Sequence, residues 1–175
     1  ETDQIERYLL LMYSHLAHHH DPGTLLAFEQ ATIATTNGVR TAKAGQVAPC
    51  QYTVPTMLAW AMAYEDRDGA RVWLMRGVPA RWWDEPGVMR GPVVHVCDGE
   101  GIHWGVETTS SGGILSFANK AQEGRNLILR TRGHRIAAAA GQVDGLEREP
   151  QVSADRERLL IPASWRKGAI TFSFD

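Results

Sequence analysis

The segment Val72-Trp73-Leu74-Met75-Arg76-Gly77-Val78-Pro79-Ala80-Arg81-Trp82-Trp83 (residues 72–83) marks a change in the hydrophobic period of the chain. Its apolar beginning is typical of a strand, and a Gly-Val-Pro run ends that strand before a pair of indoles. Before the segment, apolar residues recur mainly at helical spacing. After it, short strand-like runs alternate with turn residues. The pattern predicts an α+β chain with a helical segment at residues 1–80 and an antiparallel β-sandwich at residues 81–175.

The composition of the chain argues against nucleic acid and membranes as partners. The chain has 175 residues, of which 43% are hydrophobic, so it is long enough to bury a core. With 18 Lys+Arg against 20 Asp+Glu it has no basic surplus, which argues against nucleic acid as a partner. No run approaches the roughly 20 apolar residues that a membrane helix needs, so no membrane partner is expected. The chain starts at Glu1 without an initiator methionine, which suggests a processed chain or a piece of a larger one.

The first 80 residues contain two helical patterns and a loop. Apolar residues at helical spacing predict a helix over residues 4–19, and Asp21-Pro22-Gly23 predicts its end. Residues 24–46 mix small polar residues with an Asn-Gly turn signal and are expected to form a long, irregular loop, which is a functional hint. A second helix is expected from Thr53 to about residue 64, with Pro55 in its first turn. Trp60 and Trp73 lie in apolar runs and are expected in the core.

Strand-like runs fill the second half of the chain. Residues 136–140 also have a helical alternative, because four consecutive alanines favour a helix. Ser110-Ser111-Gly112-Gly113 is expected to form a hairpin turn. The expected strands cover residues 92–97, 102–108, 113–118, 127–131, 135–140, 159–162 and 169–174.

Histidines gather at the end of the first predicted helix, at His15, His18, His19 and His20. Residues three and four positions apart share a helix face, and imidazoles bind zinc, so a metal site is one interpretation. However, the sequence has no His-Glu-x-x-His motif and no carboxylate at ligand spacing. The favoured interpretation is a helix-end or cleft role for His19 and His20, with no metal and no other cofactor.

Glu29 follows Phe28 in the predicted loop. A carboxylate in such a loop can accept hydrogen bonds from sugar hydroxyls or take part in acid-base chemistry; the alternative is a solvated charge. Glycoside hydrolysis needs two carboxyl groups about 5–10 Å apart. The helical half offers Glu29 no evident partner, so a complete catalytic pair is not predicted.

Indoles are the third group of candidates. Their flat faces stack on sugar rings and their N–H groups donate to hydroxyls. Trp82 and Trp83 are adjacent, and adjacent residues of an extended segment face opposite ways, so the two are not expected to share one core. Trp82, Trp83 and Trp104 are therefore candidates for a binding surface.

Taken in order, these segments resemble the C-terminal end of six-hairpin (α/α)6-barrel glycoside hydrolases, a group that includes rhamnosidase-like and fucosidase-like enzymes. In that group the last barrel helices flank a substrate-facing loop, and a β-sandwich closes the chain. The matching residues are 13–18 and 24–29 for a helix and its loop, 46–52 before the last helix, 72–83 after it, and 91–93 at the entry to the β-domain.

The resemblance implies that most of the barrel, with its general acid and base, lies outside this chain. Glu29 and the neighbouring histidines would line the rim of the cleft. Two hypotheses follow. In the favoured one, the chain is the C-terminal portion or subunit of a glycosidase, completed by another polypeptide or a second copy. In the alternative, it is a self-standing carbohydrate-binding or interaction domain.

Overall fold

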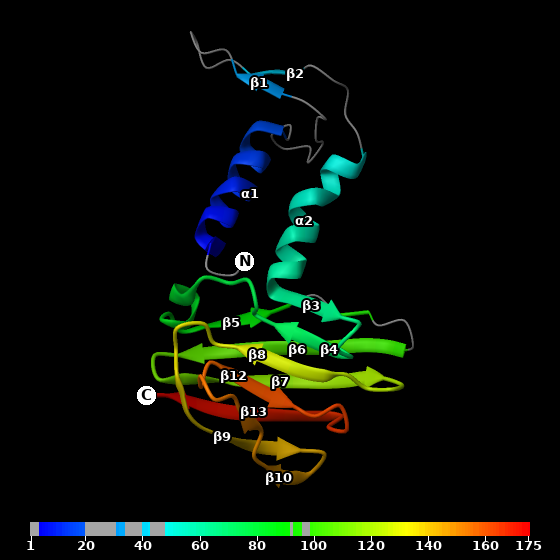
Figure 1. Cartoon of the computed structure of the whole chain (residues 1–175), viewed down its shortest axis with the longest axis vertical. Coiled ribbons are helices and arrows are strands. Elements are labelled where there is room, and N and C mark those ends of the chain that lie inside the picture. Colours follow the sequence, from blue (N-terminus) through cyan, green and yellow to red (C-terminus); the bar gives the residue numbers. More distant parts are fainter. Residues whose placement is uncertain (1–3, 20–30, 34–39, 43–47, 92, 96–98) are drawn as a thin grey trace. The chain divides into compact units, whose positions relative to one another are not determined.

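The computed structural model describes residues 4–19, 31–33, 40–42, 48–91, 93–95 and 99–175, in two compact units, Glu1–Leu58 and Ala59–Asp175 (Figure 1). The chain is α+β, and its second unit is a β-sandwich-like domain with two sheets. The division between the units falls earlier than the predicted boundary at residue 80. The reason is that the segment 63–74 pairs within a sheet of the second unit, so it belongs to the sandwich.

Two α-helices precede the sandwich strands, α1 (Ile5–His19) and α2 (Ala48–Met62). The first confirms the helix predicted over residues 4–19. The second begins before the predicted start at Thr53, so that Pro55 lies inside the helix and not in its first turn. It also ends earlier than predicted, because Tyr64 belongs to a strand.

The segment predicted as an irregular loop contains a short antiparallel strand pair, β1 (Ala31–Ile33) and β2 (Arg40–Ala42). Thr32 lies opposite Thr41 in this pair. The loop prediction was therefore incomplete. β-Branched residues on both strands suit a ladder, and the Asn37-Gly38 dipeptide between them is a hairpin signal in the sequence.

The smaller sheet of the sandwich has five strands. One neighbouring pair, β4 and β8, is parallel, because the chain leaves this sheet after β4 and forms three strands of the other sheet before it returns. The remaining pairs are antiparallel. In spatial order the strands are β11 (Gln151–Val152), β12 (Arg158–Ile161), β8 (Asn126–Arg130), β4 (Arg71–Leu74) and β3 (Ala63–Asp66).

The larger sheet has six strands, and all its neighbouring pairs are antiparallel. Its long strands β6, β7 and β13 are drawn in green to red in Figure 1. The Ser110-Ser111 turn between β6 and β7 confirms the predicted hairpin. The order is β10 (Leu146–Arg148), β9 (Ile136–Val143), β13 (Lys167–Phe174), β7 (Gly112–Ala121), β6 (Gly99–Thr109) and β5 (Gly87–Arg90).

One apolar core joins the two sheets. Leu74, Leu127 and Leu159 from the smaller sheet and Ile102 and Ile170 from the larger one belong to the same buried cluster. Along β4 and β12 the buried residues alternate with half-buried ones, whereas three consecutive residues of β8, from Leu127 to Leu129, are buried. Six of the seven predicted strands coincide with observed ones, and the helical alternative for residues 136–140 was wrong. Of the predicted strand at 92–97, the structure describes residues 93–95, where Val94 forms an isolated antiparallel bridge with Ile102.

Tertiary packing decides positions that periodicity left open. Trp60, predicted in the core, was wrongly assigned, because its side chain is 60% exposed and makes an edge contact with Tyr64. Helix α2 carries apolar residues on more than one face, so its period does not identify the buried one.

The turn between β9 and β10 is anchored by Asp144. This carboxylate accepts hydrogen bonds from the backbone N–H groups of Arg166, at 3.0 Å, and Lys167, at 2.9 Å. The two hydrogen bonds hold the pKa of Asp144 below its ordinary value of 3.8. The Asp144 carboxylate thereby fixes the start of β13, which carries Lys167.

Replacing Asp144 by asparagine is expected to lower the Tm at pH 7. A depressed folded-state pKa means that the carboxylate stabilises the fold above its ordinary pKa and loses this contribution as pH falls through the lowered value. Asp144→Asn should therefore also narrow the difference in Tm between pH 7 and pH 3, measured by circular dichroism. Asp68→Asn, which removes an exposed carboxylate, is the control. An unchanged pH dependence in Asp144→Asn would contradict this role.

Candidate functional site

The outer face of the six-stranded sheet carries the polar and charged side chains of β6. Along this strand Ile102, Trp104 and Val106 are buried, with at most 6% of their surfaces exposed. His103 and Glu107 alternate with them and are exposed. The alternation follows from the two-residue period of a strand, which sends successive side chains to opposite faces. His103, Gly105 and Glu107 therefore belong to the outer face.

The strand registers arrange this face in three rows across neighbouring strands. Facing residues in antiparallel neighbours have adjacent side chains on the same face. From β5 or β6 towards β13, the rows are Val88, Glu107 and Ile114; Arg90, Gly105, Ser116 and Ala169; and His103, Ala118 and Lys167.

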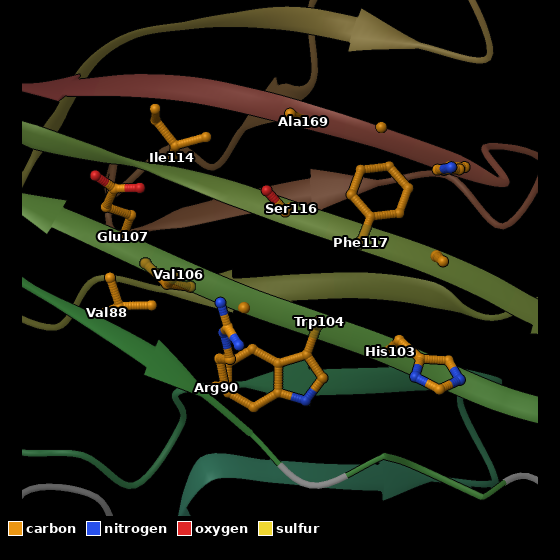
Figure 2. A pocket seen from close by; sticks show the side chains of 14 residues that line it. Val88, Arg90, His103, Trp104, Val106, Glu107, Ile114, Ser116, Phe117 and Ala169 are labelled. Carbon is orange, nitrogen blue, oxygen red and sulfur yellow. The ribbon is translucent and has the colours of Figure 1, made fainter.

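These rows enclose an open cavity of about 560 Å³, here called the groove. Its floor is formed by the small residues Gly105, Ser116, Ala118 and Ala169, whose short side chains leave space between the larger ones at the rim. Figure 2 shows Val88, Glu107 and Ile114 on one side of the groove and His103 on the other, with Ser116 and Ala169 between them. The groove therefore has an apolar side with one carboxylate, and the imidazole of His103 lies on the other side.

The charged groups of the groove are available to a ligand. Within the part of the chain that the structure describes, the side chains of Arg90, His103, Glu107 and Lys167 make no ion pair or hydrogen bond. Val88, which is 62% exposed, adds an apolar surface beside them. Such a combination of apolar contacts and a few polar groups is typical of small-molecule sites.

Trp82 lines a second, smaller cavity of about 270 Å³ that shares Val88 with the groove. Its indole is 37% exposed and lies in a short 3-10 helix, η2 (Ala80–Trp83), just before β5. The buried Thr108 hydroxyl lies 2.7 Å from the carbonyl oxygen of Glu85 and 3.3 Å from that of Gly87. These two contacts of Thr108 fix the segment between Trp82 and β5. Trp82 therefore lies next to the edge of the groove.

Of the other two predicted indoles, Trp83 is not placed for binding, and Trp104 lines the groove but exposes little surface to it. Trp83 has no exposed surface and makes edge contacts with Phe172, at 6.1 Å between ring centroids, and Phe174, at 6.2 Å. The prediction that Trp83 contacts a ligand is therefore wrong, because its indole is buried. Trp104 is 6% exposed and packs against Gly91. As expected, the two adjacent indoles do not share one core, but they lie in a 3-10 helix and not in the extended segment that the prediction assumed.

Of the other predicted site residues, His19 is the last residue of α1. Phe28, Glu29 and His20 lie outside the described residues. Sequence reasoning missed Arg90, His103, Glu107 and Lys167. The alternation within residues 102–108 was the available signal for His103 and Glu107, whereas Arg90 and Lys167 are brought to them only by strand pairing.

Aromatic side chains also lie on the outer face of the five-stranded sheet. The Arg76 guanidinium lies over Tyr64, at 5.5 Å, and over Trp73, at 5.3 Å, while Arg71 lies 6.0 Å from the Trp73 ring. These cation–π contacts occupy the faces that a sugar ring would need. This surface is therefore less suited to a saccharide than the groove.

Among the described residues, no group of three or more His, Cys, Asp and Glu is placed to hold a metal ion. None of the helices searched, likewise within the described residues, is both long and apolar enough to span a membrane. In comparisons with known proteins, no family model, no curated protein and no solved structure matches this chain.

Proposed function

We propose that this chain is the C-terminal portion or a subunit of a carbohydrate-active enzyme that hydrolyses glycosidic bonds. In this proposal α1 and α2 are terminal helices of an (α/α)6 barrel, and the catalytic carboxylates are supplied mostly from outside the chain. Glu29, His19 and His20 would line the rim of the barrel cleft. The β-sandwich would hold carbohydrate near the barrel.

The observation that supports the barrel is the exposure of apolar side chains on the two helices. On α1, Leu10, Leu11 and Tyr13 are 61–69% exposed. On α2, Tyr52 is 65% exposed and Trp60 is 60% exposed. Helices that are apolar around their circumference are normally buried among other helices. Further helices, from another polypeptide or a second copy of this chain, would cover these surfaces.

Native purification of the protein from its source tests the enzyme proposal. We expect the 175 residues to be recovered joined to, or in complex with, additional helical polypeptide, and this material to release the aryl group from aryl glycosides. Native and denaturing mass analysis identifies the polypeptides. A stable monomer of this chain alone, folded and without glycosidase activity, would contradict the proposal.

A second candidate function, carbohydrate binding without catalysis, is favoured by the groove and Trp82. Here the sandwich alone would bind the sugar, as an independent domain. The two candidates share the binding surface and differ in whether the helices belong to a catalytic barrel. Glycosidase activity of the native material distinguishes them.

Replacing Trp82 by alanine is expected to weaken oligosaccharide binding by roughly tenfold, the loss of about 1.4 kcal/mol from one aromatic contact. The free energy of unfolding should change by less than about 1 kcal/mol, because Trp82 is partly exposed. Calorimetric titration measures the first quantity and denaturant unfolding the second. Unaltered binding would exclude Trp82 from the surface.

A further inference from the structure

We propose that the groove on the six-stranded sheet selects anionic saccharides, in which sugar rings carry carboxylate or sulfate groups. The inference rests on the proposed function, that the sandwich binds carbohydrate, and adds the chemical class of the ligand. Its basis is the set of cationic side chains around the groove, the distances between them, and the apolar side opposite.

One carboxylate, Glu107, lines the groove with the cations Arg90 and Lys167, and among the described residues no ion pair joins it to either of them. Some other arginines of this unit are paired with carboxylates: Arg71 with Asp66 at 2.8 Å, and Arg156 with Asp175 at 3.0 Å. Among the described residues, Arg90 and Lys167 have no such partner. Unpaired cations that gather at one cavity raise the local concentration of anions.

The spacing of Arg90, His103 and Lys167 along the groove leaves room for an oligosaccharide with more than one acidic group. His103 and Lys167 lie in one row on either side of Ala118, two strand spacings apart, or about 10 Å between backbones. Arg90 lies in the next row, on β5. Acidic groups on successive rings can meet these side chains separately.

The opposite side of the groove fits the uncharged parts of a sugar. Val88 and Ile114 flank Glu107 in one row and present apolar surface to a ring face. The Glu107 carboxylate accepts hydrogen bonds from hydroxyls and repels acidic groups. A saccharide is therefore oriented with its acidic groups towards Arg90, His103 and Lys167.

The test is calorimetric titration of the full chain with a panel of uronate oligosaccharides, made from galacturonate, glucuronate and mannuronate. Each is matched by the same oligosaccharide with its carboxylates reduced to hydroxymethyl groups. Sulfate esters of the reduced compounds form the third arm and separate the two sources of negative charge. Binding is measured at two salt concentrations, because charge-dependent affinity falls with ionic strength.

Two variants locate the site. Arg90→Gln combined with Lys167→Gln removes charge at the rim. Gly105→Leu fills the floor: a Cβ at this position meets only the carbonyl oxygen of Met89, at 3.5 Å, and Cγ of Arg90, at 3.6 Å, which are ordinary contacts. Arg148→Gln, an exposed arginine on β10 of the same sheet outside the groove, is the matched control.

We expect at least one acidic oligosaccharide to bind at least tenfold more tightly than its reduced counterpart. The double variant and Gly105→Leu should each reduce this affinity about tenfold or more, as expected for lost charge-assisted hydrogen bonds and a filled site, and Arg148→Gln should leave it unchanged. Binding of sulfated but not carboxylated forms also supports the inference and assigns the sulfate source.

Equal affinity for acidic and reduced forms, lost in Gly105→Leu but kept in the double variant, would overturn the charge selectivity and leave carbohydrate binding in place. Binding that neither groove variant alters would exclude the groove. Absence of binding to every member of the panel would overturn both this inference and the proposed carbohydrate binding by the sandwich.

Discussion

Replacement of Trp83 by alanine is expected to lower the free energy of unfolding of the sandwich by about 3–5 kcal/mol. The indole is fully buried and contacts Phe172 and Phe174 of β13 edge-on. Alanine would leave a cavity between η2 and the core. The carboxylate of the next residue, Asp84, accepts a hydrogen bond from Nε2 of His134 at 2.8 Å, and this contact depends on the same placement of η2.

The adjacent indole provides the matched control, because Trp82→Ala removes the same side chain from a partly exposed position. Denaturant unfolding followed by far-UV circular dichroism measures all variants. Trp83→Phe should cost much less than Trp83→Ala, since it retains an aromatic ring and removes an indole N–H that has no hydrogen-bond partner among the described residues. Equal effects of Trp82→Ala and Trp83→Ala would contradict the assignment of Trp83 to the core.

Replacement of Gly112 by alanine is expected to destabilise the sandwich by about 2–5 kcal/mol, through overpacking and backbone strain together. Gly112 begins β7 with φ at +154°, and a Cβ there would lie 2.0 Å from the carbonyl oxygen of Phe172. The backbone at position 112 and the carbonyl group of Phe172 belong to paired strands. Neither can move without disturbing the hydrogen-bonded ladder between β7 and β13.

Gly145→Ala separates the two causes. Gly145 has φ at +79°, but a Cβ there meets nothing within 4 Å, so alanine adds only left-handed strain, about 1–2 kcal/mol. The same unfolding measurement compares the variants. If Gly112→Ala cost no more than Gly145→Ala, the close approach of Phe172 would not constrain position 112.

Local patterns predicted much of this chain. Helical spacing identified α1, and alternation between turn residues identified most strands of the sandwich. The alternation within residues 102–108 also indicates which side chains of β6 face the core and which face outward. The less successful predictions concern segments where local preference is divided. Ala137 to Ala140 favour a helix intrinsically, but pairing with β13 places them in a strand.

The candidate site was less predictable than the fold. Lys167 is separated from His103 by 64 positions in the sequence, yet the register of β6, β7 and β13 puts the two in one row. No local signal reports such a register. Conversely, Trp82 and Trp83 were equivalent candidates by chemistry, and only packing against Phe172 and Phe174 assigned one of them to the core.

The sequence by itself therefore determined the class of the chain, the α1 helix and the sandwich strands, because hydrophobic period and turn residues act locally. Only the tertiary structure decided that the sandwich begins before residue 80, that Trp83 is buried, and that Arg90, His103 and Lys167 surround one groove. Those features depend on strand pairing and on exclusion of apolar surface from water, which join residues far apart in the chain.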